Sequence, residues 1–153
     1  MLDTRHIGHP LGAGTVEVEK GRLRFFAKAT GQTDHVYFDE GAAAQAGYRS
    51  LPVPPTFFFC LEMEACGSSQ LCDLFGIGIG QLLHGEQHFS YHAPAVAGDT
   101  LGFNGRVTDV YHKKGGALGF IGVETRVTSQ AGTHMADMRR IVVVRMNVES
   151  PTP

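Results

Sequence analysis

Residues 53–67 read VPPTFFFCLEMEACG, and this stretch decides the fold. Two prolines and Thr56 are typical of the start of a helix, with Thr56 as its N-cap. The residues that follow are apolar on nearly all sides until Gly67, so the helix has no face that water can cover. We therefore predict a central helix after Thr56 that other elements must wrap.

The second half of the chain has the pattern of strands. From Leu83 onward apolar and polar residues alternate, which is typical of a half-buried strand. Four strand candidates follow at residues 83–91, 101–112, 117–129 and 134–145, and the last three are separated by KKGG and SQAGT, turns of the kind that join antiparallel neighbours. We predict an α+β fold in which an antiparallel sheet curls around the central helix.

Two shorter helices are expected before the central one. Leu23, Phe26 and Ala27 recur at helical spacing, and an alanine-rich run begins after the N-cap signal of Asp39 and can end at Gly47. The 153 residues fit a single domain, 1–153, with a core at about 14–146 and a loose tail at 147–153.

Composition excludes several classes of protein. Apolar residues make up 42% and charged residues 18%, with a net charge of -2, which favours a soluble globule without a basic face for nucleic acid. No apolar run is long enough for a signal peptide or a membrane span, so we expect a cytoplasmic protein. Cys60, Cys66 and Cys72 lack CxxC spacing and are expected to be free, mostly buried thiols. We expect no metal and no organic cofactor.

The loop at residues 30–40, TGQTDHVYFDE, holds more polar chemistry than a turn requires. In one interpretation it only connects two helices, with Asp34 in an Asx turn and Asp39 as a helix cap. In the other it is a site loop, in which Asp34 and His35 are the groups with pKa values suited to proton transfer. Both interpretations stay open at this point.

Three motifs together resemble a known family. VPPTF at 53–57, LHGEQHFSYHAPAVAGD at 83–99 and ATGQTDHVYFDE at 29–40 are similar to the MaoC-like hydratase/dehydratase group of hot-dog proteins. The likeness runs from about residue 14 to residue 146 and is strongest to the branch that forms the amino-terminal half, or one subunit, of two-part hydroxyacyl-thioester dehydratases. The resemblance implies a hot-dog fold, a homodimer or a heterodimer with another hot-dog chain, and an acyl thioester of coenzyme A or acyl carrier protein as substrate.

The family's catalytic loop reads G-D-x-N-P-x-H, and its Asp and His hold the catalytic water. The resemblance places Gln32 at the Asp position and Tyr37 at the His position, while Asp34 and His35 fall on the Asn and the Pro. Gln32 cannot take a proton, and Tyr37, with an ordinary pKa near 10, is a poor base at neutral pH. The proton-handling pair of the family is thus replaced, with Asp34, His35 or Tyr37 left in altered roles.

Other candidate residues lie on the central helix and the first strand of the second half. The resemblance implies a backbone N–H at the helix start as the oxyanion donor; Pro55 has none, which leaves Thr56, with Phe57 beside it as a substrate-binding residue. His84 and Glu86 are further candidates for substrate binding. Together with His88 they alternate along one strand and are expected to share a face, as a metal triad or, more simply, as a polar sheet face.

Three functions follow from these observations. The first is an (R)-specific enoyl-thioester hydratase or 3-hydroxyacyl-thioester dehydratase. The second is a non-catalytic, acyl-binding subunit that completes the site of a catalytic partner. The third is a hot-dog acyl-CoA thioesterase that uses Glu62 or Glu64 of the central helix, although both carboxylates are equally explained as partners of a basic residue such as Arg139 or Arg140.

Overall fold

The computed structural model describes residues 1–146, so the tail expected at 147–153 lies outside the described residues. Its sheet has five strands in the order β1-β3-β4-β5-β2, and each pairs antiparallel with its neighbours. The strands are β1 (Gly14–Glu17), β2 (Leu82–Tyr91), β3 (Thr100–Lys113), β4 (Leu118–Ser129) and β5 (His134–Arg145). The four strands predicted from alternation are β2 to β5, and the predicted α+β class is confirmed.

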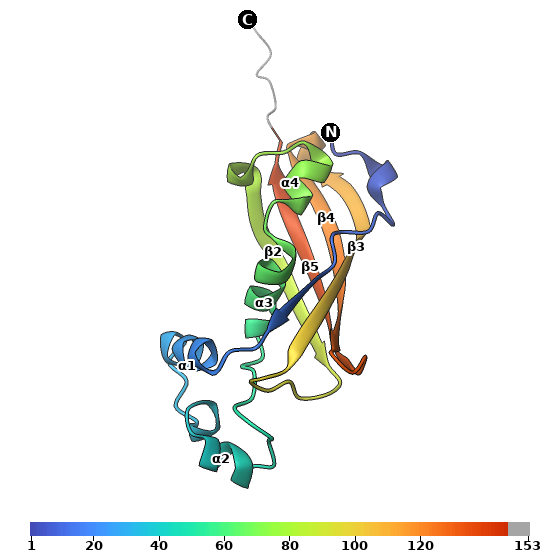
Figure 1. Cartoon of the computed structure of the whole chain (residues 1–153). Coiled ribbons are helices and arrows are strands. Elements are labelled where there is room, and N and C mark those ends of the chain that lie inside the picture. Colours follow the sequence, from blue (N-terminus) through green and yellow to red (C-terminus); the bar gives the residue numbers. More distant parts are fainter. Residues whose placement is uncertain (147–153) are drawn as a thin grey trace, which may run out of the picture.

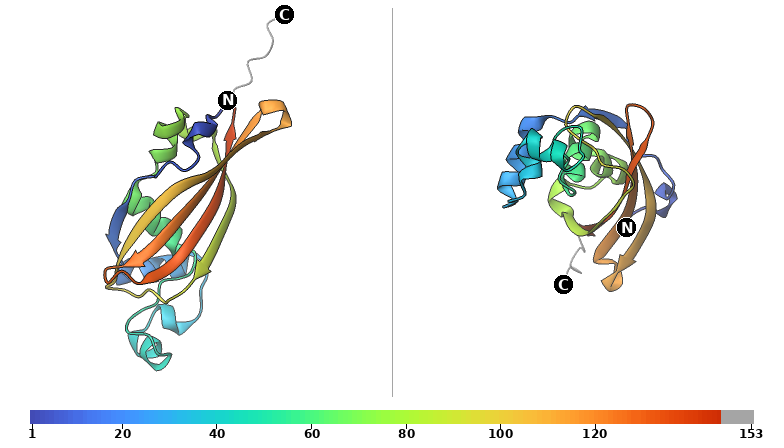
Figure 2. Two further views of the ribbon diagram at one scale, coloured as in Figure 1. Left: turned by 90° about the vertical axis from the view of Figure 1, so that its right-hand side faces the viewer. Right: turned by 90° about the horizontal axis from the view of Figure 1, so that it is seen from below.

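The helices lie on the concave side and at the two ends of this sheet. They are α1 (Lys20–Ala29), α2 (Glu40–Gln45), α3 (Phe57–Cys66) and α4 (Gln70–Phe75), with short 3-10 turns η1 (Thr4–His6), η2 (His35–Tyr37), η3 (Ile79–Gln81) and η4 (Lys114–Gly116). Figure 1 shows α3 running along the sheet, with α1 and α2 at one end of the molecule and α4 at the other. The view from below in Figure 2 shows the sheet curling around α3.

The central helix predicted from residues 53–67 is α3. Thr56 occupies its N-cap position, although the Thr56 side chain makes no capping hydrogen bond, and Gly67 ends the helix at a positive φ of 79°. Phe57, Phe58 and Leu61 are buried against the surrounding elements. Burial on several sides is the reason why this helix needs no polar face.

The core is divided into two clusters along α3. The first joins the amino-terminal part of α3 to α1, α2 and the strand ends around Leu101, Phe103 and Val127. The second lies under α4 and contains Leu71, Leu2, Leu11, Val107, Val110, Ile121, Val123, Val142 and Val144. The two ends of α3 therefore meet different surroundings, which matters for the cavities described below.

The strand β2 differs from the sequence prediction in one respect. Its pairing with β5 shifts register between His84 and Glu86, because Gly85 bulges out of the ladder. His84 then lies on the side of α3, where its ring packs edge-on against Phe59, while Glu86 bonds His88 away from the helix. The prediction that His84, Glu86 and His88 share one face is therefore wrong, since a one-residue shift turns a side chain to the other face.

The strand β2 also forms one edge of the sheet and is exposed over most of its length. The opposite edge is β1, which has four residues. An edge as long as β2 leaves a row of backbone donors and acceptors available to another strand. Among residues 1–146, no helix is long and apolar enough to cross a membrane.

Candidate functional site

The loop at residues 30–40 uses its polar side chains to hold its own backbone. The Gln32 side-chain oxygen accepts hydrogen bonds from the N–H groups of Thr33 and Asp34, at 2.9 and 3.1 Å. The Asp34 carboxylate accepts the N–H of Val36 at 3.1 Å, which caps η2. At the next helix the Asp39 carboxylate accepts the N–H of Ala42 at 2.7 Å. The interpretation of Asp34 as a turn residue and of Asp39 as a helix cap is confirmed.

One member of this loop, Tyr37, reaches a cavity at the amino-terminal end of α3. The cavity has a volume of about 340 Å³, and Tyr37 lines it together with Pro55, Tyr91 and His92. Burial, and then the nearby Tyr48 and Asp34, raises the pKa of Tyr37, and burial raises the pKa of Tyr91. Both phenols therefore stay protonated at neutral pH and can donate a hydrogen bond, but they are poor bases. His35 is exposed and does not line this cavity.

The start of α3 lies beside this cavity and supplies backbone groups. The Phe57 N–H donates to the carbonyl of Pro54 at 2.9 Å, and the Phe57 ring packs in the core against Phe26, with 4.8 Å between ring centroids. Among the described residues, no such backbone partner is found for the Thr56 N–H. Thr56 thus keeps a donor at the amino end of a helix, where the helix dipole favours developing negative charge.

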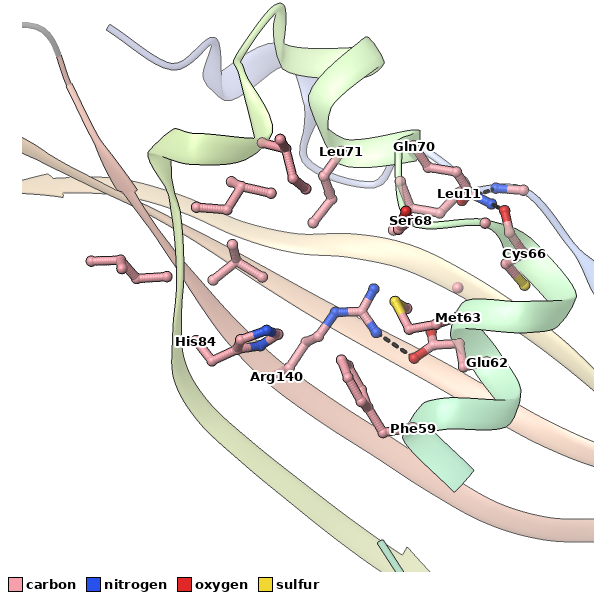
Figure 3. Close-up of a pocket in the computed structure, with 17 residues that line it drawn as sticks. Leu11, Phe59, Glu62, Met63, Cys66, Ser68, Gln70, Leu71, His84 and Arg140 are labelled. Atoms are coloured by element: carbon pink, nitrogen blue, oxygen red, sulfur yellow. Dashed lines mark hydrogen bonds and ion pairs between the residues drawn. The ribbon is translucent and has the colours of Figure 1, made fainter. Parts of the chain in front are cut away.

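A second, mostly apolar cavity of about 350 Å³ lies at the other end of α3 (Figure 3). It is enclosed by α3, α4, β2, β5 and the segment after η1, and Ile79 and Leu83 add exposed apolar surface beside it. Its principal apolar lining residues are Leu11, Phe59, Met63, Leu71, Leu82 and Val142. An apolar cavity of this size with a few polar groups is typical of a site for a small molecule.

The polar wall of this cavity is a buried ion pair. Arg140 on β5 donates from Nη1 to Oε2 of Glu62 on α3, and the Thr125 hydroxyl donates to the other carboxylate oxygen, Oε1, at 2.5 Å. The side chains of Glu62 and Arg140 are 4% and 11% exposed. The Arg140 guanidinium also lies over the Phe59 ring, 5.9 Å from its centroid. Low exposure and a second hydrogen bond make this a fixed pair.

The expectation that a basic residue engages the helix carboxylates is confirmed, with different partners for the two. Glu62 pairs with Arg140, and Glu64 pairs with Arg22 on α1. Burial, and then the nearby Glu62, raises the pKa of the Cys66 thiol, which also lines the cavity. Cys66 is therefore a neutral thiol at neutral pH, and the cysteines are free, as expected, but half-buried.

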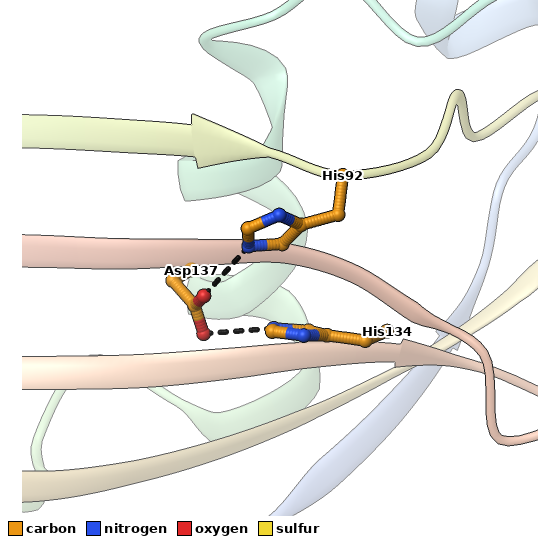
Figure 4. Close-up of side chains that lie close together, drawn as sticks. All are labelled: His92, His134 and Asp137. Atoms are coloured by element: carbon orange, nitrogen blue, oxygen red, sulfur yellow. Dashed lines mark hydrogen bonds and ion pairs between the residues drawn. The ribbon is translucent and has the colours of Figure 1, made fainter.

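A group of two histidines and a carboxylate lies at the far end of β2 (Figure 4). Nε2 of His92 is 2.8 Å from Oδ2 of Asp137, and Nε2 of His134 is 2.9 Å from Oδ1. Burial works to raise the pKa of Asp137, but the hydrogen bonds from the two imidazoles outweigh it and lower that pKa. In the described part of the chain this group could hold a metal ion, because its ligand atoms lie within 4.8 Å of one another.

Sequence reasoning missed two of these arrangements. One is the group of His92, His134 and Asp137, which no local sequence pattern brings together. The cavity at the carboxyl end of α3 was also missed, because its walls come from segments far apart in the chain. The apolar stretch at residues 57–61 was the available signal, and it did not distinguish a cavity wall from a packed core.

Comparisons with known proteins agree with this geometry. The family model described as FAS1-like, dehydratase domain region, matches residues 5–138. A relative from Thermobifida fusca, named UPF0336 protein, is 30% identical over 136 residues, which cover 89% of this chain and 88% of the relative.

Solved structures show the same fold. One is a truncated HadBC (3R-hydroxyacyl-ACP dehydratase) complex from Mycobacterium tuberculosis, with a TM-score of 0.78, 24% identity and coverage of 93% of this chain and 99% of the other. A structure described as MaoC-like dehydratase has a TM-score of 0.81 and 26% identity, and the match covers 93% of this chain but 43% of that longer one. The predicted hot-dog fold is confirmed.

Proposed function

Because this chain belongs to the FAS1-like, dehydratase domain region family, whose model spans residues 5–138, we propose that it is the acyl-binding subunit of a two-chain hydratase or dehydratase. Its substrate is an enoyl or 3-hydroxyacyl thioester of coenzyme A or acyl carrier protein. The catalytic acid and base come from a second hot-dog chain. In this role the chain needs no metal and no organic cofactor.

The observation that carries this proposal is the separation of the cavity from the loop. The apolar cavity lies at the carboxyl end of α3, whereas Tyr37 and the loop lie at its amino end. Gln32 and Asp34 hold backbone N–H groups within the loop, and neither Asp34 nor His35 lines the apolar cavity or the loop cavity. Hydration of an enoyl thioester requires a group that takes up and releases a proton beside the substrate.

A dimer through the open edge of β2 would bring the two parts together. Leu82, Leu83 and His84 at the start of β2 line the apolar cavity, and Tyr91 at its end lines the loop cavity. If two β2 strands pair antiparallel about a two-fold axis, the start of one strand lies beside the end of the other. The cavity of this chain would then continue from the catalytic loop of its partner.

The two chains have different roles because one supplies the catalytic groups and the other supplies the acyl cavity. A partner loop of the form G-D-x-N-P-x-H contributes the proton-handling Asp and His, and a backbone N–H at the start of its central helix stabilises the enolate oxygen. This chain removes the acyl group from water in its cavity and so positions the thioester at the partner's loop. The HadBC structure is a complex of a 3R-hydroxyacyl-ACP dehydratase, which supports a two-chain arrangement.

The test is the hydration of crotonyl-CoA and longer enoyl-CoA esters by the chain alone and after addition of a hot-dog chain that keeps the family's loop. We expect no more than weak turnover by the chain alone and strong turnover by the pair, since loss of a working acid or base lowers a rate by about a hundredfold or more. Light scattering of the two-chain mixture at micromolar concentration should detect a dimer rather than two monomers.

Strong turnover by the chain alone would contradict the proposal. If this turnover survives in Asp34→Asn, His35→Ala and Tyr37→Phe, the loop is not its source of acid and base. That outcome would move the acid–base chemistry to other residues of this chain. Turnover by the chain alone that is lost in these variants would instead show that the loop itself is catalytic. Both results differ clearly from activity that depends on the partner.

A further inference from the structure

We propose that the apolar cavity selects an acyl group that carries a second neutral oxygen function, a ketone or a hydroxyl, in its middle or distal part, apart from the oxygen on the reacting carbons, and that Arg140 binds this oxygen. This inference rests on the proposed function and names the substrate class for the same cavity. A cavity meant only for an alkyl chain needs no polar wall. Here a buried ion pair, Glu62 with Arg140, lines the space instead.

The guanidinium of Arg140 has more N–H donors than its one hydrogen-bond partner among the described residues uses. It carries five N–H donors, and among the described residues its hydrogen-bond partner is the Glu62 carboxylate, bound through Nη1. In Figure 3 the second terminal nitrogen points away from Glu62 into the cavity. A bound alkyl chain would cover these donors without replacing the hydrogen bonds that water gives them, which lowers affinity. A ligand oxygen placed there would accept one of them.

The charge balance of the wall indicates that the oxygen is neutral. The positive charge of Arg140 is already matched by Glu62, whose second oxygen accepts the Thr125 hydroxyl. A carboxylate on the ligand would lie close to the Glu62 carboxylate and be repelled in a low-dielectric site. Cys66, the other polarizable group beside Glu62, is a neutral thiol because burial raises its pKa. A ketone or hydroxyl oxygen meets no such repulsion.

The size of the cavity also agrees with part of an acyl chain rather than a whole coenzyme. Its volume is about 350 Å³. At about 30 Å³ for each non-hydrogen atom, the volume of one water molecule in the liquid, this is room for roughly twelve such atoms. His84 and Phe59 form the wall next to Arg140, with their ring centroids 5.5 Å apart. The lining includes His84 at the start of β2, Leu71 of α4 and the Arg140 side chain.

The experiment measures the Kd of the full-length chain by calorimetry for dodecanoyl-CoA and for a series of oxododecanoyl-CoA esters, with the ketone at successive carbons from the middle to the end. We expect at least one oxo ester to bind tenfold or more tightly than dodecanoyl-CoA. In the double variant Glu62→Leu/Arg140→Met this preference should disappear, and dodecanoyl-CoA should bind at least as tightly as to the wild type. Replacing both charges by apolar residues of similar size generally preserves folding, which circular dichroism would verify.

The control variant is Phe25→Ala, which changes an exposed side chain of α1 outside the cavity and should leave every Kd as it is. The inference is overturned if the wild type binds dodecanoyl-CoA as tightly as every oxo ester, or if the preference survives in the double variant. In those cases the chain would still be an acyl-binding subunit. Failure to bind any of these esters would overturn the inference and the proposed function together.

Discussion

Removal of one partner of the buried ion pair is expected to have a large effect on stability. In Arg140→Met the Glu62 carboxylate, 4% exposed in the wild type, keeps the hydrogen bond from Thr125 but loses its counter-charge. Breaking a buried pair in this way typically lowers the free energy of unfolding by about 3–5 kcal/mol. Because a domain is stable by about 5–15 kcal/mol, this loss removes at least about a fifth of the free energy of unfolding.

Urea unfolding gives the magnitude directly. The chain has no tryptophan, so circular dichroism is the suitable signal. With an m value of about 2 kcal/mol/M, a loss of about 4 kcal/mol lowers the midpoint by about 2 M. The double variant Glu62→Leu/Arg140→Met leaves no unpaired charge and should unfold within about 1 kcal/mol of the wild type or be more stable. A loss below about 1 kcal/mol in Arg140→Met, at unchanged m, would refute the idea of a desolvated pair.

Two further predictions concern packing and pH. A methyl group in Gly14→Ala would overlap the carbonyl oxygen of Ala65 where β1 crosses α3, so we expect a loss of about 1–3 kcal/mol in the same urea assay; a wild-type midpoint would contradict this contact. The pKa of Asp137 lies below its ordinary value of 3.8, because the hydrogen bonds from His92 and His134 outweigh burial. The stability that the ionised Asp137 contributes to the folded state is therefore fully present above the ordinary pKa of 3.8 and is lost as the pH falls through the lowered pKa. Because Asp137 is half exposed, the stability gap to Asp137→Asn should be below about 1 kcal/mol at neutral pH and should close in acid; a gap that widens in acid would be the wrong sign.

Much of the fold was predictable because local pattern and tertiary structure agree. The period-two segments after Leu83 became β2 to β5, and the apolar stretch after Thr56 became α3. The strand β1 was not predicted, since four residues show too little alternation and depend on pairing with β3. The helix α4 was not predicted either. Six residues are too few to form a stable helix by themselves, and α4 depends on the packing of Leu71 in the second core cluster.

The candidate site was less predictable, because it depends on contacts between distant residues. Nothing in the local sequence pairs Glu62 with Arg140, which are 78 positions apart. The direction of His84 depends on a bulge at Gly85, which alternation alone does not reveal. By contrast, the roles of Asp34 and Asp39 within their own turns are local hydrogen bonds, and these were predicted from the sequence.

The central claim, that this chain holds the acyl group for a catalytic partner, is tested most directly by a block of the cavity. Met63 has a side chain that points into the cavity in Figure 3, and Met63→Trp would place a larger, rigid ring there. The matched control is Phe25→Trp on the exposed face of α1. The measurement is the ratio of hydration rates for dodecenoyl-CoA and crotonyl-CoA in the reconstituted pair. We expect Met63→Trp to lower this ratio at least tenfold and Phe25→Trp to leave it unchanged. An equal ratio in wild type and Met63→Trp would contradict the claim.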